Sequence, residues 1–444
     1  MQPRAFLASL ETFGIKLGLE QIRTLLDALG HPERGFPSIS IVGTNGKGSV
    51  TAMIERGLRA AGYRTGRYTS PHLVHLEERF AIDGQPVSAR SLDDALVEVQ
   101  AASRSLPHPP TYFEATTAAA LLLFARAGAG SRQHVREPSR RQGDHDVTGV
   151  DVALLEAGLG GRLDATNAVD AAGVVVTSID FDHQEHLGES LAAIAAEKAA
   201  VIKPGSVVVT VPQPPDAAEA VTRRCQMVGA TLVQAVPVPQ ADVTLIDGRA
   251  RLHLATPRRA YGPLTLGLRG RHQVGNAVAA VLMLEALDER GLFSIDADAI
   301  RQAVEDAAWP GRLDLLDVDG VDVLIDGAHN PAGAKALAAY LREVIGRPVP
   351  VVLGVMRDKD AAAIVEALAG CANRFVCTAP SSARSMSPAD LTALAASVAT
   401  NLPVDAAASP ADAIRAAATS GTPVVVAGSL YLAGEVRALA TTPP

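Results

Sequence analysis

Short runs of apolar, β-branched residues alternate along this chain with longer stretches whose apolar positions recur every three or four residues. The first pattern is typical of strands buried in a parallel sheet, and the second of amphipathic helices. Strands are expected in the first two thirds of the chain at 39–42, 67–69, 152–155 and 174–179, and helices at 5–30 (broken at 14–18), 52–61, 91–106, 115–127, 189–201 and 275–290. This alternation predicts an α/β fold with a mostly parallel sheet.

Some finer features of these elements can also be predicted. Ser91 is expected to cap the helix 91–106, and Asn276 to begin the helix 275–290. The stretch 115–127 is apolar nearly all round and should be buried. Residues 204–270 are rich in Pro and Gly and resemble a series of strands.

The pattern pauses near Trp309, where we expect a domain boundary. After it the alternation starts afresh, with strands at 321–325, 349–353, 374–377 and 424–427 and helices at 332–345, 361–369, 391–399 and 411–419. This predicts a P-loop-type ATP-binding domain over 1–308, followed by a doubly wound, Rossmann-like α/β domain over 309–444. Within the first domain, residues 131–149 are polar and are expected to form an exposed, mobile insertion, with a basic binding arm as the alternative.

Composition narrows the class of protein. A chain of 444 residues is too long for one core and suits two or three domains. The net charge of −8 and the aromatic content of 4% both disfavour a nucleic-acid-binding protein. No apolar run is long enough to cross a bilayer, the N-terminus lacks a signal-peptide pattern, and Cys225, Cys371 and Cys377 lack zinc or disulfide spacing. We therefore expect a cytoplasmic protein without membrane or nucleic-acid partners.

A glycine-rich turn at 43–49 separates the first predicted strand from a helix. Backbone N–H groups and the positive end of the helix dipole would face an anion there. Lys47 would add a charge on the outer phosphates, and Ser49 a hydroxyl near a metal ion. The usual P-loop spacing is not met, because Ile41 stands where its first glycine belongs and Gly48 separates Lys47 from Ser49. We interpret the turn as an ATP site, with an ordinary glycine-rich turn as the alternative.

Two further clusters follow predicted strands, where open α/β sheets place their ligands. Glu156 ends the strand 152–155 and precedes a glycine-rich loop, a position that suits a metal ligand better than packing. Asp182 and His183 follow the strand 174–179. Because Mg²⁺ prefers oxygen ligands, His183 suggests a second, softer metal position or a contact through water.

Lys198 and the turn 326–331 complete the candidate chemistry. Lys198 lies seven positions after Leu191, on the apolar face of the helix 189–201, so it needs a partner or must lose its charge. Snorkelling or a salt bridge would satisfy it, and carbamylation by CO₂ is an equal alternative. The turn 326–331 could close with Arg312 over ATP held by the first domain, and a structural Asx turn is the competing interpretation.

Taken in order, these clusters resemble the Mur ligase superfamily and, more narrowly, the folylpolyglutamate synthase/dihydrofolate synthase family. The motifs that carry the resemblance are 43–49, 69–72, 112–116, 156–167, Asp182-His183, Glu197-Lys198, Asn276, Gly311-Arg312, 326–331 and 354–360. The form Gly-Gly-Arg-Leu-Asp-Ala-Thr-Asn at 160–167 is similar to the bacterial bifunctional branch, which accepts dihydropteroate as well as reduced folates.

The resemblance implies a reaction in which ATP phosphorylates a carboxylate and the amino group of L-glutamate attacks the acyl phosphate. It implies a reacting centre of Lys47, Glu156, His183 and Lys198. It also implies ATP contacts from Thr44, Asn45, Gly46, Lys47, Gly48, Ser49, Asn276, Arg312 and Asp326. Two Mg²⁺ ions would be held by Thr69, Glu156, His183 and carbamylated Lys198. The pterin substrate and glutamate would contact Leu17, Gly18, Tyr112, Phe113, Glu114, Leu163, Asp164, Ala165 and His329.

Three alternatives stay open at this point. A monofunctional folylpolyglutamate synthase would carry the same motifs. Another Mur-type amide ligase should have a uridine-nucleotide domain before the cradle, but only 42 residues precede Gly43. A P-loop switch or GTPase would need an Asn-Lys-x-Asp guanine reader, which Asp358-Lys359-Asp360 does not supply. The partners expected are small-molecule substrates, and the protein is expected to be a monomer.

Overall fold

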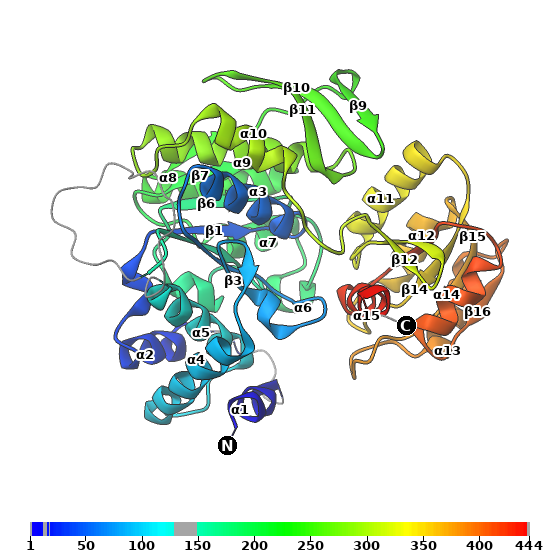
Figure 1. Ribbon diagram of the computed structural model, residues 1–444, viewed down its shortest axis with the longest axis horizontal. Coiled ribbons are helices and arrows are strands. Elements are labelled where there is room, and N and C mark those ends of the chain that lie inside the picture. The colour runs from blue at the N-terminus through cyan, green and yellow to red at the C-terminus, as the bar shows by residue number, and fades with distance from the viewer. Residues whose placement is uncertain (1, 12–15, 17, 128–148, 442–444) are drawn as a thin grey trace.

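The chain forms two α/β units, seen at the left and right of Figure 1, in a computed structural model that describes residues 2–11, 16, 18–127 and 149–441. The first unit contains an eight-stranded sheet in the order β4-β3-β2-β5-β1-β6-β7-β8. Its strands are β1 (Ser38–Val42), β2 (Thr65–Tyr68), β3 (Phe80–Ile82), β4 (Gln85–Pro86), β5 (Val152–Glu156), β6 (Gly173–Val176), β7 (Val207–Thr210) and β8 (Thr231–Gln234). The six strands from β2 to β8 in this order are parallel, and β3 and β4 add an antiparallel edge.

Helices cover both faces of this sheet because its central strands are apolar on both sides. Val152 and Leu154 of β5 join the core under one group of helices, whereas Ala153 and Leu155 join the core under another. The first group is α3 (Lys47–Ala60), α9 (Gln273–Glu289) and α10 (Ala297–Glu305). The opposite face carries α1 (Pro3–Leu10), α2 (Glu20–Ala28), α4 (Ala89–Ala102) and α5 (Tyr112–Arg126), then α7 (Leu191–Ala199) and α8 (Pro215–Val228).

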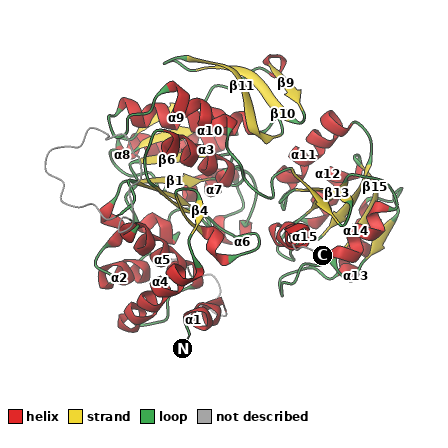
Figure 2. Cartoon of the chain, in the orientation of Figure 1, coloured by secondary structure: helices red, strands yellow, loops and turns green. Residues whose placement is uncertain are grey.

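A small antiparallel sheet of β9 (Val243–Ile246), β10 (Arg249–Ala255) and β11 (Ala260–Arg269) packs on the first core. It lies at the top of Figure 2. The second unit has a six-stranded sheet of order β12-β13-β17-β14-β15-β16, in which only β12 is antiparallel. Its elements are β12 (Asp314–Val318), β13 (Val321–Ile325), α11 (Pro331–Tyr340), β14 (Val349–Leu353), α12 (Ala361–Ala369), β15 (Ala372–Cys377), α13 (Pro388–Val398), β16 (Val404–Ala406), α14 (Pro410–Ala418), β17 (Val424–Ala427) and α15 (Leu430–Thr441).

The predicted fold class is confirmed: a mostly parallel sheet with helices on both faces is followed by a second, doubly wound α/β unit. The buried helix expected at 115–127 is α5, whose N-terminus Thr111 and Glu114 close with a capping box. The predicted domain boundary at 308/309 falls between α10 and β12 and stays a prediction. No helix in the part of the chain described here is long and apolar enough to cross a membrane.

Several local predictions are wrong. Ser88, not Ser91, caps α4, because the side chain of Ser88 accepts the backbone N–H of Ser91. Helix α9 begins at Gln273, so Asn276 lies in its first turn. Residues 204–270 are not all strand, since α8 runs through them from Pro215. The pattern also gave no indication of α10, β12, β16 or α15. The predicted insertion 131–149 lies almost wholly outside the described residues.

Candidate active site

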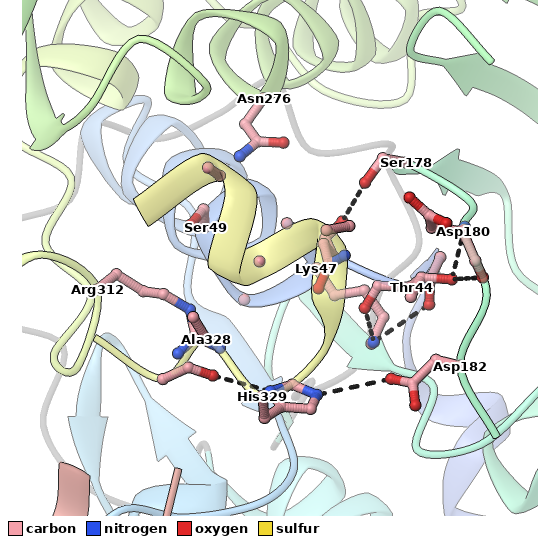
Figure 3. Close-up of a pocket in the computed structure, with 18 of the residues that line it drawn as sticks. Thr44, Lys47, Ser49, Ser178, Asp180, Asp182, Asn276, Arg312, Ala328 and His329 are labelled. Carbon is pink, nitrogen blue, oxygen red and sulfur yellow. Dashed lines mark hydrogen bonds and ion pairs between the residues drawn. The ribbon is translucent and has the colours of Figure 1, made fainter. Parts of the chain in front are cut away.

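A cavity of about 520 Å³ lies between the two units, at the carboxyl ends of β1, β5 and β6. The first unit contributes the turn 43–49, Glu156, residues 158–160, Asp182, Lys198 and Asn276. The second unit contributes residues 326–329 and one side of α11. Figure 3 shows side chains from both units directed toward this shared space. The sequence-predicted ATP residues are therefore brought together, although they are spread over almost 300 positions.

The turn 43–49 is shaped as an anion cradle. Gly46 has a φ of 88° and precedes α3 without a capping side chain, so the first N–H groups of that helix have no side-chain acceptor. Residues that follow β6 hold the turn in place. The N–H of Thr44 donates to the Ser178 carbonyl at 2.7 Å. The Thr44 hydroxyl donates to the Asp180 carbonyl at 3.0 Å (Figure 3). Any side chain at Gly46 would collide with Asn276, since a Cβ there would lie 2.5 Å from Oδ1.

Two lysines meet on this turn. Lys47 donates through Nζ to the carbonyls of Gly43 at 3.2 Å and Thr44 at 3.1 Å, and Lys198 donates to the same Gly43 carbonyl at 3.0 Å. Lys198 is buried and forms no ion pair with a carboxylate of the described chain, so it neither snorkels nor joins a salt bridge. Burial, reinforced by the charge of Lys47, lowers the pKa of Lys198 to about 7. A substantial share of its amine is therefore neutral near pH 7.

Glu156 is the last residue of β5 and lies buried at the cavity wall, where it accepts the backbone N–H of Ser70. Burial raises its pKa, while the charges of Lys47 and Arg312 oppose that rise. The predicted ligand Thr69 is buried beside β2 but does not line the cavity, whereas the hydroxyl-bearing residues Ser49 and Ser70 do.

These donors fit Mg²⁺ rather than a caged transition metal. Within the described residues, no three His, Cys, Asp or Glu side chains are grouped to hold an ion by themselves. Mg²⁺ commonly takes one or two carboxylates, keeps several waters and shares the phosphates of a nucleotide. One buried carboxylate with hydroxyls of Ser49 and Ser70, next to a phosphate cradle, has the chemistry of such a site.

Asp182 connects the two units. Its carboxylate lies 2.5 Å from Lys359 Nζ, 3.2 Å from Asn330 Nδ2 and 3.7 Å from His329 Nε2. Figure 3 shows the His329–Asp182 contact as a dashed line across the cavity. Burial alone would raise the pKa of Asp182, but the His329 hydrogen bond and the charge of Lys359 outweigh it and hold that pKa well below its usual range.

His183 lies beside this pair with its Nε2 3.2 Å from Lys359 Nζ. Its backbone is in the left-handed region, with a φ of 51°, at the start of the short helix α6 (Gln184–Leu187). Burial lowers its pKa to about 4, so the imidazole is neutral at pH 7 and able to act as a ligand.

The second unit approaches the nucleotide turn through its own polar residues. Asn330 caps α11, and its amide exchanges two hydrogen bonds with that of Asn45, at 3.0 and 3.3 Å. Asp326 holds the local turn by accepting the N–H groups of Leu313 and Ala328. The Asx turn considered from the sequence is thus present, but it faces the cavity and forms part of it.

The predicted pterin-site residues lie apart from this cavity, behind the loop 158–161. The carboxylates of Glu114 and Asp164 are already engaged in local hydrogen bonds. Glu114 accepts the N–H of Thr111. Asp164 accepts the N–H groups of Gly158, Leu159 and Thr166. The ring of Phe113 lies against Gly158, which does line the cavity. Tyr112, Gly18, Leu163 and Ala165 are described but do not line it, and Leu17 lies outside the described residues.

Sequence reasoning missed some residues of the cavity region, notably Ser70, Ser178, His272, Gln273 and Lys359. Ser70 is adjacent to the predicted Thr69, so an error of one residue explains it. Lys359 lies in the motif 354–360, but only the structure reveals that it reaches Asp182 of the other unit.

Comparison with known proteins gives consistent matches. Residues 311–430 match the family model described as Mur ligase, glutamate ligase domain. The chain is 36% identical over 399 residues to the dihydrofolate synthase/folylpolyglutamate synthase of Mycobacterium tuberculosis, covering 85% of this chain and 76% of that protein. It is 32% identical over 355 residues to that of Bacillus subtilis, covering 78% of this chain and 77% of that protein.

Solved structures match over the whole chain. Mycobacterium tuberculosis folylpolyglutamate synthase complexed with ADP and AMPPCP superposes with a TM-score of 0.86 at 32% identity, covering 100% of both chains. E. coli FolC in complex with DHPP and ADP superposes with a TM-score of 0.82 at 28% identity, covering 99% of this chain and 97% of that one.

Proposed function

Because this chain belongs to the folylpolyglutamate synthase/dihydrofolate synthase family of Mur-type ligases, it is an ATP-dependent ligase, and we propose that it joins L-glutamate both to dihydropteroate and to reduced folates. The observation that carries the proposal is the shared cavity, which is lined by the phosphate cradle 43–49 and by residues 326–329 of the glutamate ligase domain. A monofunctional folylpolyglutamate synthase is the alternative, and the cavity geometry favours neither.

The reaction proceeds in two steps. The substrate carboxylate attacks the γ-phosphorus of ATP, the bond to the β,γ-bridging oxygen breaks, and ADP leaves an acyl phosphate. The amino group of L-glutamate then attacks the acyl carbon, loses a proton and expels phosphate, which forms the amide. Both steps depend on charge neutralisation and on positioning two reactants in one enclosed space.

The residues assigned to ATP support this two-step reaction. The N–H groups at the start of α3 and the ammonium of Lys47 would hold the phosphates, with Thr44, Asn45, Gly46, Gly48 and Ser49 shaping the cradle. We place Asn276, Arg312 and Asp326 on the nucleotide, since all three line the same cavity. His329, on the opposite wall, is assigned to the incoming glutamate.

For Mg²⁺ we propose Glu156 and the hydroxyl of Ser70, in place of Thr69, as first ligands, with His183 and carbamylated Lys198 at a second position. When bound, the ions would neutralise charge on the transferring phosphoryl group. The buried amine of Lys198, with a pKa of about 7, has the neutral form that reacts with CO₂.

We assign the pterin substrate to the aromatic and loop residues Tyr112, Phe113 and 163–165, behind the cavity. A cytoplasmic monomer stays a prediction.

Product analysis tests the proposal. The purified protein is incubated with MgATP and L-glutamate, once with dihydropteroate and once with tetrahydrofolate, and ADP and product masses are measured. We expect a mass gain of one glutamate on both substrates, with ADP formed only when pterin acid and glutamate are both present. A gain on tetrahydrofolate alone would establish the monofunctional alternative. ATP hydrolysis that needs neither substrate would contradict the ligase assignment for this chain.

A further inference from the structure

A buried arginine without a carboxylate partner lies next to the site described above. Arg79 ends the 3₁₀ turn Leu76–Arg79 and is only 8% exposed. Its Nε donates to Nδ1 of His72 at 2.9 Å, and its guanidinium carbon lies 5.3 Å from the centre of the Tyr112 ring. Neither contact neutralises its charge, since His72 has a pKa lowered to about 4, chiefly by burial, and is uncharged at pH 7.

The acidic residues that precede Arg79 are occupied elsewhere. Glu78 accepts the backbone N–H groups of Leu73, Val74 and His75, and Glu77 pairs with Arg4 at 2.7 Å. No described carboxylate lies within ion-pair distance of Arg79. A buried guanidinium normally has an anionic partner, because an unpaired buried charge is costly. The Arg79 guanidinium is therefore a buried cation whose anionic partner is not among the described residues.

The position of Arg79 indicates where that anion comes from. Its partner His72 is two residues from Ser70, which lines the cavity and donates to Glu156. Its other neighbour, Tyr112, begins α5 beside Phe113, and the Phe113 ring stacks near Tyr68 with centroids 5.8 Å apart. Arg79 thus contacts His72, which follows the cavity residues Ser70 and Pro71 in the chain, and Tyr112, whose neighbour Phe113 offers an aromatic ring suited to stacking on a flat pterin or aminobenzoyl group.

The two proposed substrates differ in the anions they carry. Dihydropteroate has one carboxylate, the reacting one, which must reach the phosphate cradle. A folate bearing one or more glutamates has in addition an α-carboxylate on each residue, none of which reacts. Guanidinium binds such a carboxylate in a bidentate manner, with two parallel N–H···O bonds.

Resting on the proposed function, we propose that Arg79 is a specificity residue that binds a non-reacting α-carboxylate of the glutamate tail. It would thereby favour glutamylated folates, and so chain extension, without contributing to the binding of dihydropteroate. His72 and Tyr112 position the guanidinium, so that its terminal amino groups stay available to the substrate.

Kinetics of Arg79→Gln test this inference. The variant loses a charged hydrogen bond to the tail, so the KM for tetrahydrofolate mono- and triglutamate should rise roughly 10- to 100-fold. The kcat should change by no more than about twofold, because the bond is made equally in the ground and transition states. The dissociation constant of dihydropteroate, measured by competition whether or not it is turned over, should stay unchanged. Arg79→Lys should recover part of the loss.

Binding of dihydropteroate also shows that the variant is folded. Arg67→Lys is the matched control, since Arg67 is similarly buried and lies 4.8 Å from the Trp309 ring, but it already has Glu55 as its partner at 2.7 Å. In Arg67→Lys, the KM for the glutamylated folates and the dissociation constant of dihydropteroate should change by the same factor. An equal loss for both substrates in Arg79→Gln, or an unchanged KM for the glutamylated folates, would overturn the inference. If instead the wild-type protein forms no glutamate-dependent ADP with any pterin acid, the proposed function itself fails.

Discussion

Replacing Asp182 by Asn should loosen the connection between the two domains. The substitution keeps the size of the side chain and one acceptor oxygen but removes the charge. In the native protein that charge lies 2.5 Å from Lys359 Nζ, whose side chain is 8% exposed, and within reach of Asn330 and His329. After the change, Asp358, at 3.8 Å, is the one described carboxylate that stays within ion-pair distance of Lys359.

The magnitude follows from the burial of this pair. Removing one member of a buried ion pair costs about 3–5 kcal/mol, because the other charge is left unpaired. Asp358 and the retained amide oxygen compensate in part, so we expect a loss of about 2–3 kcal/mol. That energy corresponds to a fall of roughly 30- to 150-fold in the equilibrium constant for the closed arrangement of the domains.

The assay combines urea unfolding, small-angle scattering and turnover. Asp182→Asn should unfold at lower urea concentration, show a larger radius of gyration and lose kcat, because the glutamate-binding side no longer faces the cradle. Asp405→Asn is the matched control: its ion pair with Arg374 at 2.8 Å lies within the second domain and is half exposed. Its loss should be below about 1 kcal/mol, without a change in radius.

The acid limb of the stability curve gives a second readout. The pKa of Asp182 is held below its unfolded value, so its contribution is complete above about pH 4 and is lost as the pH falls through the folded pKa. The asparagine variant should lack this part of the acid dependence. Equal unfolding free energies, acid profiles and radii for the wild type and Asp182→Asn would refute the reasoning.

Further predictions concern the cradle, the lysine, the metal ligand and a helix cap. Gly46→Ala should weaken ATP binding at least about tenfold, since it combines a left-handed φ with a collision against Asn276, whereas Gly370→Ala, which has open space, should not. With a pKa of about 7, roughly nine tenths of Lys198 amines are neutral at pH 8 and able to react with CO₂. CO₂ depletion should therefore lower activity, and bicarbonate should restore it. An unmodified Lys198 amine in the fully active enzyme would argue against carbamylation. Glu156→Gln should raise the Mg²⁺ concentration needed for half-maximal rate, and an unchanged requirement would remove Glu156 from the metal site. Ser88→Ala should cost about 1 kcal/mol of unfolding free energy without changing KM, whereas Ser91→Ala should cost less.

The sequence was most informative where a local pattern determines structure by itself. The strand, glycine turn and helix around 43–49 could be predicted because each step depends on neighbouring residues. Glu156 and Asp182 were found for a related reason: polar residues that directly follow buried strands reach the same edge of a parallel sheet.

The errors arose where a choice between local alternatives depends on distant packing. Ser88 and Ser91 are both suitable caps, and the burial of Leu92 and Leu96 in the core shared with α1, α2 and α5 fixes the start of α4. Helix α8 was obscured by the prolines before it, yet Pro215 occupies a position in the first turn where proline is tolerated. β12 is an edge strand with alternating exposure, a weaker signal than the buried strands beside it.

Contacts between domains could not have been predicted from the chain alone. Lys359 and Asp182 are 177 positions apart, and nothing near either residue identifies the other as its partner. The occupation of Glu78 by three backbone N–H groups, which leaves Arg79 without an anion, likewise depends on the path of the loop 73–75.

Trp309, the only tryptophan in the chain, lies where the first domain ends and its indole packs on Gly48 of the nucleotide turn, with the Arg67 guanidinium 4.8 Å from its ring. The molecule thus carries a single tryptophan, and that residue lies against the nucleotide turn at the end of the first domain. Its emission offers a label-free optical signal in which nucleotide arrival and domain movement can be timed separately, by adding ATP before or after the second substrate.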